Sequence, residues 1–441
     1  MNAPSPFTAA TAIPFYPQYG LFSLAGGFVR QWEYNGWKPE SLSWKTGCYI
    51  HAGLSGMGQI VYRGPDAEAF LARTFVNNFT NFRPGTAKHA IACTGEGLIA
   101  GHGVLQRLGA EEFCLYVAGP WTPYAFSVFD GNVEQVVKSD FLFQIAGPTS
   151  LATLEAATGE SLRDVNFLRY RQTSVGGHPV QIMRVGMAGT LAFELHGPLS
   201  QAAEIYDLIV QAGRPHGLQR LGWQTFQVNH VEGGFPQQFW TFSSAAHWDA
   251  GFRAFMSTMP YRFPDPIMAG SIDPADVRAR CRTPVEVGWQ RSVRLDHDFT
   301  GRAALERELA APKRTVVTLE WNADDVIDIY ASLFRDGEEY KYLEMPVSPA
   351  NRGLCGHADH VIKGGEVVGI SSGTVYSYHF RRVISHATID LDEAQVGNEV
   401  TVLWGDYGGR IKEVRATVAR FPYLQDGRNQ SVDLAALPAT A

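Results

Sequence analysis

The chain has 441 residues, of which 45% are hydrophobic and 18% are charged, and its formal net charge at pH 7 is −7. This composition is typical of a globular protein with two or three domains and excludes a largely disordered chain. The negative charge argues against nucleic-acid binding, which requires a basic face.

Residues 1–44 are expected to form an N-terminal arm. Residues 1–29 carry no charge, but four prolines interrupt them and no positive residue precedes an apolar core. Because a helix loses hydrogen bonds and clashes at each interior proline, we expect neither a membrane helix nor a signal peptide here. No other run is long and apolar enough to span a bilayer. Residues 1–29 are therefore predicted to lie extended on the protein surface.

Residues 45–311 alternate short strands with helices. Gln59–Arg63 reads as a strand, and Gly64-Pro65-Asp66 then opens a helix through Phe75, because proline is tolerated in a first turn. The same order of strand, turn and helix recurs at residues 143–157 and 193–213. The pattern predicts an α+β domain with two subdomains, in which helices cover one face of antiparallel sheets.

Residues 288–305 are predicted to form a short strand, a turn and a helix. The turn is Asp296-His297-Asp298, and Thr300 is the expected N-cap because its hydroxyl can accept a hydrogen bond from a first-turn amide.

The composition changes near Pro312, after which strands dominate. Strands are expected at 316–321, 366–371 and 399–404, with glycine-rich turns between them. We therefore predict a small β-barrel over residues 312–425. The remaining residues, 426–441, are polar and then alanine-rich, and they are expected to form a loosely ordered tail.

The cysteines are odd in number and scattered, without a Cys-x-x-Cys pair: Cys48, Cys93, Cys114, Cys281 and Cys355. This usage is typical of reduced thiols in the cytoplasm, and it favours neither a disulfide framework nor a thiolate metal site. The histidines at 357, 360, 379 and 386 include one His-x-x-His pair in a turn context, but no third ligand is fixed by a motif. No metal is predicted.

Several segments resemble one enzyme family. The segments 143–148, 184–189, 193–195, 288–305 and 367–373 resemble the tetrahydrofolate-dependent aminomethyltransferases, the T-protein of glycine cleavage and its relatives. Within that family, the segments 296–299, 318–325, 329–334, 376–378 and 401–405 are most similar to the aryl-ether O-demethylases of vanillate and syringate type. The resemblance implies a three-lobed cloverleaf, with two N-terminal α+β subdomains and a C-terminal β-barrel around a central folate site. It also implies transfer of a one-carbon unit to folate N5.

Glu194 lies where this family keeps its pterin-binding carboxylate. The 2-amino-4-oxo edge of a pterin presents two adjacent N–H donors, which a carboxylate can accept side by side. Gln144, Arg184 and Met187 belong to the same resembling segments and are expected to line the folate site. The alternative for Glu194 is a surface glutamate on a hairpin.

His102 lies where the family normally has an aspartate beside N5. An imidazole can take up a proton near neutral pH, which suits a general base, but it supplies no permanent negative charge. The substitution argues against a glycine-cleavage enzyme. The alternative is a histidine that only satisfies a turn.

Two other departures bear on the substrate. The chain has Ala52 and Gly56-Met57 where the family tends to have an aspartate followed by a His-Met turn. An arginine that the demethylases use near the aryl carboxylate is replaced by Gly119 or Pro120. Loss of this cation favours a bulkier uncharged ether of lignan or lignin type over a small benzoate. A methylenedioxy bridge, which would transfer a methylene group, remains an alternative to a methyl ether.

Residues 235–263 are rich in aromatic side chains without helical or strand periodicity. We expect them to line an aromatic substrate pocket, with His247 as a possible proton donor, although dense aromatics equally suit a core. Tyr376 and Tyr378 are further candidate donors to the leaving oxygen, or structural tyrosines. The predicted substrate-binding residues are Trp121, Tyr124, Phe239, Trp240, Phe242 and Trp248.

The sequence thus predicts a cytoplasmic, tetrahydrofolate-dependent one-carbon transferase that acts on an aromatic ether. Two alternatives are a non-catalytic folate-binding module and a fragment of a flavin-linked oxidase. The second would need a Gly-x-Gly-x-x-Gly dinucleotide motif, which the chain lacks near residues 24–28. The sequence leaves the identity of the ether and the oligomeric state open.

Overall fold

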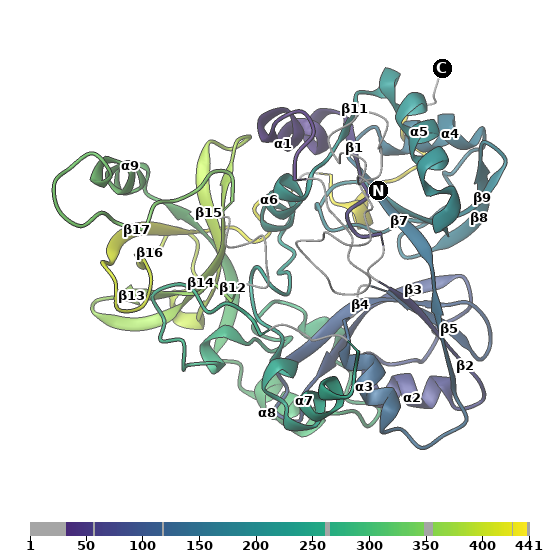
Figure 1. Cartoon of the computed structure of the whole chain (residues 1–441), viewed down its shortest axis with the longest axis horizontal. Coiled ribbons are helices and arrows are strands. Elements are labelled where there is room, and N and C mark those ends of the chain that lie inside the picture. The colour runs from purple at the N-terminus through teal and green to yellow at the C-terminus, as the bar shows by residue number, and fades with distance from the viewer. Residues whose placement is uncertain are drawn as a thin grey trace.

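The computed structural model describes residues 32–55, 58–116, 119–260, 265–347, 356–425 and 427–438. Figure 1 shows three lobes, namely a β-barrel on the left and two sheet-containing lobes on the right. This arrangement confirms the expected cloverleaf of two α+β subdomains and a C-terminal barrel. The expected extended arm over residues 1–29 and the Gly56-Met57 turn lie outside the described residues.

The first subdomain contains a six-stranded sheet in the order β11-β1-β7-β10-β9-β8. All neighbouring strands are antiparallel except β1 and β11, which are parallel. Helices α4 and α5 pack on this sheet through a core that includes Phe143, Phe193 and Ile205. The bounds are β1 Cys48–His51, β7 Asp140–Ala146, α4 Ser150–Thr158, β8 Tyr170–Val175, β9 His178–Met183, β10 Ala192–Pro198, η1 Leu199–Gln201, α5 Ala202–Gly213, η2 Arg214–His216 and β11 Leu218–Arg220.

The second subdomain contains a five-stranded sheet in the order β3-β4-β5-β2-β6. Its core gathers the aromatic rings of Phe70, Phe75 and Phe113 between the sheet and the helices α2, α3 and α7. The bounds are β2 Gln59–Arg63, α2 Ala67–Thr74, β3 Thr86–Cys93, β4 Ile99–Arg107, β5 Glu112–Tyr116, α3 Trp121–Ser127, β6 Glu134–Lys138, η3 Ala245–Trp248 and α7 Ala250–Ser257.

The C-terminal lobe is a closed barrel in the order β12-β15-β14-β13-β16-β17. Closure leaves no free sheet edge, and inward side chains such as Leu319, Val402 and Trp404 fill the interior. The Asn322 side chain caps α9 by accepting from two first-turn amides. The bounds are β12 Arg314–Trp321, α9 Ala323–Ser332, β13 Asp359–Lys363, β14 Glu366–Ser377, β15 Arg382–Asp390, η7 Leu391–Glu393, β16 Glu399–Trp404 and β17 Lys412–Ala419.

Helix α6, Trp223–Gly233, lies at the junction of the lobes, where every one of its residues is buried. Glu232 near its end pairs with Lys45 of α1, Trp37–Thr46, and accepts a hydrogen bond from Ser377 of β14. A buried carboxylate needs such partners to offset its lost hydration. This contact joins the first helix, the central helix and the barrel.

Two local expectations are wrong. The short strand expected before the Asp296-His297-Asp298 turn is absent, because η5 (Gln290–Ser292) and the irregular residues 293–295 precede that turn. Helix α8, Arg302–Ala310, begins after Gly301, whose left-handed backbone (φ +90°) replaces the expected Thr300 cap. Within the N-terminal arm, residues 37–44 are helical.

The C-terminal segment is also more ordered than expected. A short helix, η8 (Asn429–Ser431), precedes Leu434, which is buried against the core of the first subdomain. Arg163 donates to the carbonyl oxygens of Leu434 and Leu437, at 2.9 and 2.6 Å. A segment held by an apolar anchor and by charged donors is docked, not a loose tail.

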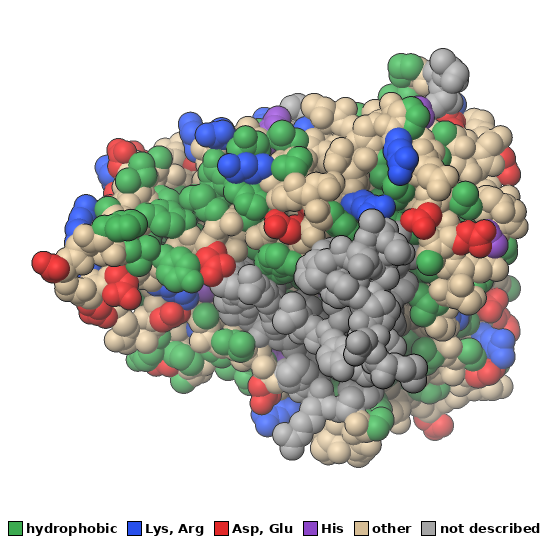
Figure 2. Space-filling view, turned by 45° about the horizontal axis from the view of Figure 1, so that its top comes forward, with side chains coloured by type: hydrophobic (Ala, Val, Ile, Leu, Met, Phe, Trp, Pro, Cys, Tyr) green, Lys and Arg blue, Asp and Glu red, His purple; other side chains and the backbone are tan. Residues whose placement is uncertain are grey.

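Two surface properties complete the description. In Figure 2, acidic and basic side chains are interspersed over the visible face, so neither sign forms a continuous patch there. None of the helices in the described ranges combines the length and the apolarity that a membrane span requires.

Candidate functional site

One row of side chains crosses the six-stranded sheet. Glu194 on β10 lies opposite Gln144 on β7 and Met183 on β9, and Gln144 lies opposite His51 on β1. Residues directly opposite one another in a sheet point to the same face. The strand alternation therefore places a carboxyl, an amide, a thioether and an imidazole side by side.

Glu194 is a buried carboxyl group. It accepts hydrogen bonds from the Tyr116 hydroxyl at 3.2 Å and from the Gln144 amide at 3.3 Å. Burial raises the pKa of Glu194 to about 7, although these two hydrogen bonds act in the opposite direction. The nearby imidazole of His196, 3.9 Å away, has its pKa lowered to about 3 by burial and is therefore uncharged at pH 7.

The network behind Glu194 contains an unused acceptor. The Tyr49 hydroxyl donates to the Gln144 side-chain oxygen at 2.6 Å and accepts from the Asn229 amide at 3.1 Å. The side-chain oxygen of Asn229 is buried and has no hydrogen-bond partner within the described residues. Because a buried acceptor without a partner is costly, this oxygen and the free lone pairs of Glu194 are suited to a ligand that carries several N–H donors.

A second row crosses the five-stranded sheet and meets the first. Tyr116 on β5 lies opposite Gln59 on β2 and Val104 on β4, and Val104 lies opposite His89 on β3. His102 precedes Val104 by two residues, so it points to the same face. The Tyr116 hydrogen bond to Glu194 joins this face to the first row. The register thus places Tyr116, which contacts Glu194, on the same sheet face as His102.

His102 is buried in a cage of rings, which we define as His89, Phe235, Phe242 and Trp289. The ring centroids lie between 4.9 and 6.2 Å from that of His102. Its Nδ1 lies 3.2 Å from Nε2 of His89. Burial lowers the pKa of His102 well below its usual range, and His89 and His230 act in the same direction. His102 is therefore a neutral imidazole at pH 7.

Further rings connect the His102 cage with the row of side chains on the six-stranded sheet. His51 stacks on Phe226 with a centroid distance of 3.9 Å, and Phe226 lies 4.5 Å from His230. His230 in turn lies 5.9 Å from Phe235 of the cage. Burial lowers the pKa of His230 to about 3. These rings are thus largely uncharged at pH 7. Such a surface suits an uncharged aromatic ligand and excludes water.

Part of the predicted site is brought together here. Gln144 contacts Glu194, and the Met187 sulfur lies 3.2 Å from Nε2 of His230. Phe242 belongs to the cage, and the ring of Trp240 lies 4.9 Å from that of His230. Phe239, which has a left-handed backbone (φ +82°), packs against the hydrophobic cluster that contains Phe226 and Trp240.

Arg184 is not part of this junction. Its guanidinium donates to Asn429 and to the Val432 carbonyl of the C-terminal segment. These donors dock the C-terminal segment, and folate binding by Arg184 stays a prediction. Sequence reasoning could not anticipate this, since a docked C-terminal segment was not expected.

Trp121 and Tyr124 lie elsewhere, in the hydrophobic core of the second subdomain. Trp121 packs against Tyr124 and Phe252, with ring centroids 5.2 and 5.8 Å apart. They contribute to folding rather than to the cage. Aromatic residues suit a core and a binding site equally, so substrate binding by these two residues stays a prediction.

Trp248 and His247 are also separate from the cage. Trp248 lines a surface pocket of about 360 Å³ together with Cys281 and Arg278. His247 is buried in η3 beside Trp248, and burial lowers its pKa to about 4. Neither residue has a ring contact with His102.

The two candidate phenols contact the first helix. The rings of Tyr376 and Tyr378 lie 5.9 and 5.7 Å from that of Trp37 in α1, both edge-on. They lie at the seam between the barrel and α1, where within the described residues their rings contact Trp37, Lys38 and Arg381, and not His102 or Glu194. Tyr261 and Phe263 of the aromatic segment lie outside the described residues.

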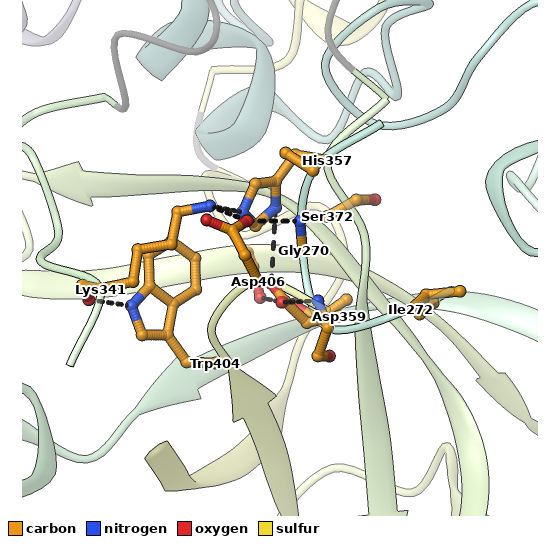
Figure 3. A network of polar contacts seen from close by, with 12 residues as sticks. Gly270, Ile272, Lys341, His357, Asp359, Ser372, Trp404 and Asp406 are labelled. Atoms are coloured by element: carbon orange, nitrogen blue, oxygen red, sulfur yellow. Dashed lines mark hydrogen bonds and ion pairs between the residues drawn. The ribbon is translucent and has the colours of Figure 1, made fainter. Parts of the chain in front are cut away.

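His357 belongs to a different network, which Figure 3 shows. His357 lies 3.4 Å from the Asp359 carboxylate and 3.5 Å from the Lys341 ammonium, and Lys341 pairs with Asp406 at 2.6 Å. Asp406 also accepts from the Gly270 amide at 3.0 Å. Within the described residues, no group of three or more His, Cys, Asp and Glu side chains is arranged to hold a metal. The network ties residues 270–273 to the barrel.

Several residues of the junction could not be recognised as site residues from the sequence. They are Tyr116, Asn229, His51, His89, His230 and Trp289. The strand alternation in β1, β3 and β5 would have placed three of them on a buried face, but only a known register assigns that face to the site. Trp289 lies in the segment 288–305, which resembles the family, and this position could have indicated that it belongs to the site.

Comparison with known proteins gives several matches. The GCVT N-terminal domain family matches residues 16–241. The sesamin methylene transferase of a Sinomonas species is 38% identical, covering 96% of each chain, and the syringate O-demethylase of a Sphingobium species is 30% identical, covering 91% of each chain. The crystal structure of the glycine cleavage aminomethyltransferase T from Bartonella henselae superposes with a TM-score of 0.65 and 16% identity, covering 94% of this chain and 96% of that one, which shows the fold alone.

The two near-full-length matches and the domain match confirm the family expected from the motifs. With a domain match over more than half of its length and relatives aligned over nearly all of it, the chain belongs to the aminomethyltransferase family built on the GCVT N-terminal domain.

Proposed function

We propose that this protein is a tetrahydrofolate-dependent one-carbon transferase that removes an O-linked carbon from an aromatic ether of lignan or lignin type and passes it to folate N5. The observation that carries the proposal is the 38% identity, over nearly the whole chain, to an enzyme named sesamin methylene transferase. This relation favours a methylenedioxy bridge as the donor and a methylene group as the transferred unit. The 30% identity to syringate O-demethylase keeps methyl ethers as the second candidate.

The residues of the junction fit a reduced pterin. Glu194 offers carboxylate lone pairs to two adjacent N–H donors, and the Asn229 side-chain oxygen is a buried acceptor without a partner in the described structure. A ligand with several N–H donors on one edge would satisfy both. We assign pterin binding to these two side chains, with Gln144 and Tyr116 holding the Glu194 carboxyl in place.

The chemistry divides between the bound folate and the chain. When bound, tetrahydrofolate supplies the N5 amine that acts as the nucleophile towards the ether carbon. His102 is assigned the proton transfer, because a neutral imidazole can accept a proton and then return it. The rings of the cage exclude water and position the aryl group, and positioning alone can account for about 7–11 kcal/mol of a barrier.

The imidazoles beside Glu194 and His102 have pKa values lowered by burial and are uncharged at pH 7, which suits an uncharged substrate. We also infer a cytoplasmic location, since the described cysteines are buried free thiols, as reduced surroundings permit.

A product analysis tests the proposal. Purified protein is incubated with tetrahydrofolate and, in separate reactions, a methylenedioxyphenyl lignan, a methoxylated aromatic and no donor. Mass spectrometry then detects methylene- or methyl-tetrahydrofolate together with the phenolic product. We expect methylene-tetrahydrofolate and a catechol from the first donor only. Methyl-tetrahydrofolate from the second donor would reassign the transferred group, and no folate product from any ether would refute the function.

A further inference from the structure

His89 and His102 form a direct imidazole–imidazole contact that follows from the sheet register. His89 lies opposite Val104 and His102 lies opposite Ile91, so the two histidines are diagonal neighbours on one face of adjacent strands. Long and aromatic side chains reach across such diagonals. The 3.2 Å separation of His89 Nε2 and His102 Nδ1 is a hydrogen-bond distance.

Both rings are uncharged in the resting protein. Burial lowers the pKa of His89 to about 4 and lowers the pKa of His102 well below its usual range. The titratable group on another element that acts on His102 is His230 of α6, which is also neutral at pH 7. When two neutral imidazoles are joined by one hydrogen bond, only one of the two facing nitrogens carries a proton. The tautomer of each ring therefore determines the tautomer of the other.

We propose that His89 is a positioning residue that accepts a hydrogen bond from Nδ1–H of His102 and thereby keeps His102 Nε2 unprotonated as the base for the transfer reaction. The inference rests on the proposed function, and it states which ring nitrogens of that site carry a proton. His89 takes the orienting role that a carboxylate has in other imidazole bases, but it adds no charge. His102 therefore remains neutral until the reaction begins.

The proton balance of the step is closed. As the carbon–nitrogen bond forms and the carbon–oxygen bond breaks, the proton lost by the attacking amine goes to Nε2 of His102. His102 then donates this proton to the departing aryl oxygen, so that an N–H and a C–O bond are replaced by a C–N and an O–H bond. One such exchange completes the transfer from a methyl ether. A methylenedioxy bridge requires the exchange twice, so that two N–H and two C–O bonds of the reactants are replaced by two C–N and two O–H bonds. No oxidant, reductant or external proton is required.

Burial disfavours the charged form of His102, so an imidazolium formed there is short-lived. Its Nδ1–H remains bonded to a neutral acceptor, His89, while the faces and edges of Phe235, Phe242 and Trp289 surround the ring within 6.2 Å. Aromatic faces stabilise a cation without fixing it permanently. A carboxylate at the position of His89 would instead favour the protonated base at rest.

The tautomer is measured on the ligand-free protein. Histidine side chains are labelled with ¹⁵N, and long-range ¹H–¹⁵N spectra distinguish protonated from unprotonated ring nitrogens. The His102 signals are assigned by their loss in His102→Gln, with His178→Gln as the assignment control from a solvent-accessible site. We expect His102 to be protonated at Nδ1 only, and His89→Leu to give a mixture of tautomers. Protonation at Nε2, or an unchanged tautomer in His89→Leu, would overturn the inference.

Kinetics provides a second readout. Because a positioned base contributes about 10²–10⁴-fold to a rate, we expect His89→Leu to lower kcat by about 10- to 100-fold while folate affinity changes by less than about twofold. His89→Gln, whose side-chain oxygen can accept the same hydrogen bond, is expected to restore most of kcat. Equal losses in both variants would contradict the role of His89. If the wild-type protein transfers no carbon at all, the NMR result still decides the tautomer separately from the proposed function.

Discussion

The Tyr116 hydroxyl donates a hydrogen bond of 3.2 Å to the Glu194 carboxylate, and this contact joins two sheets that belong to different subdomains. Tyr116 shares its sheet face with His102, and Glu194 shares its face with Gln144 and His51. The anchor assigned to the pterin and the base assigned to the proton are thus held by two rigid sheets, and not by loops. A site built on sheets keeps its geometry within the narrow limits that group transfer requires.

Replacement of Glu194 should weaken folate binding. Glu194→Gln keeps the shape but removes a charge-assisted pair of hydrogen bonds, which corresponds to about 1.5–3 kcal/mol and thus to about a 10- to 100-fold higher Kd. Calorimetry with tetrahydrofolate measures the change, and Glu204→Gln on the exposed side of α5 is the matched control. An unchanged Kd in Glu194→Gln would remove Glu194 from the site.

The affinity for folate should depend on pH through the same carboxyl. Burial raises the pKa of Glu194 to about 7, so in the ligand-free protein the neutral form dominates below that pH and the carboxylate dominates above it. Since the N–H donors of a pterin bind the carboxylate, Kd should fall as pH rises from about 6 to 8. The corresponding titration of Glu194→Gln should show a flatter profile, and an equally steep profile in both proteins would contradict this assignment.

Removal of the base should affect turnover far more than binding. We expect His102→Gln to lower kcat by about 10²–10⁴-fold and to leave the Kd for folate nearly unchanged. Single-turnover kinetics combined with calorimetry separates the two quantities. A variant that binds folate poorly but retains its kcat would reverse the roles that we assign to His102 and Glu194.

Two tryptophans that the sequence does not distinguish should behave differently. Trp289 belongs to the His102 cage, whereas Trp248 lines a separate surface pocket. Trp289→Leu should raise KM for the ether or lower kcat/KM by about tenfold, which corresponds to about 1.4 kcal/mol of lost contact. Trp248→Leu is the matched control and should leave both constants unchanged. The opposite pattern would place the substrate in the surface pocket.

Arg184 should act on stability and not on folate. Its guanidinium holds Asn429 and Val432 of the C-terminal segment, and its loss leaves buried carbonyl groups without donors. Arg184→Leu should lower the free energy of unfolding by about 1–3 kcal/mol and leave the Kd for folate unchanged. Urea unfolding and calorimetry decide between this role and a direct role in folate binding, which would appear as a raised Kd.

Much of the fold could be predicted because its signals are local. The Gln59–Arg63 strand, the following helix and the barrel strands are marked by turn residues and by their hydrophobic pattern. The Thr300 cap was wrong because Gly301 adopts a left-handed conformation that moves the helix start by one residue. Such single-residue differences depend on contacts that are distant in sequence.

The site could be predicted only in part, because its partners are not local. Glu194 and His102 were found through a family resemblance, whereas His89 and Tyr116 become recognisable only when the strand register places them on the same face. Trp121 and Tyr124 were assigned to the substrate although they pack in a core. Composition cannot separate these two uses of an aromatic ring.

A structure of the protein bound to tetrahydrofolate tests the central claim most directly. We predict that the amino and N–H groups of the pterin edge contact the Glu194 carboxylate, and that the N5 side of the ring faces Nε2 of His102 within the cage. A pterin bound elsewhere, or bound with Glu194 uncontacted and His102 on the far side of a packed core, would contradict the account.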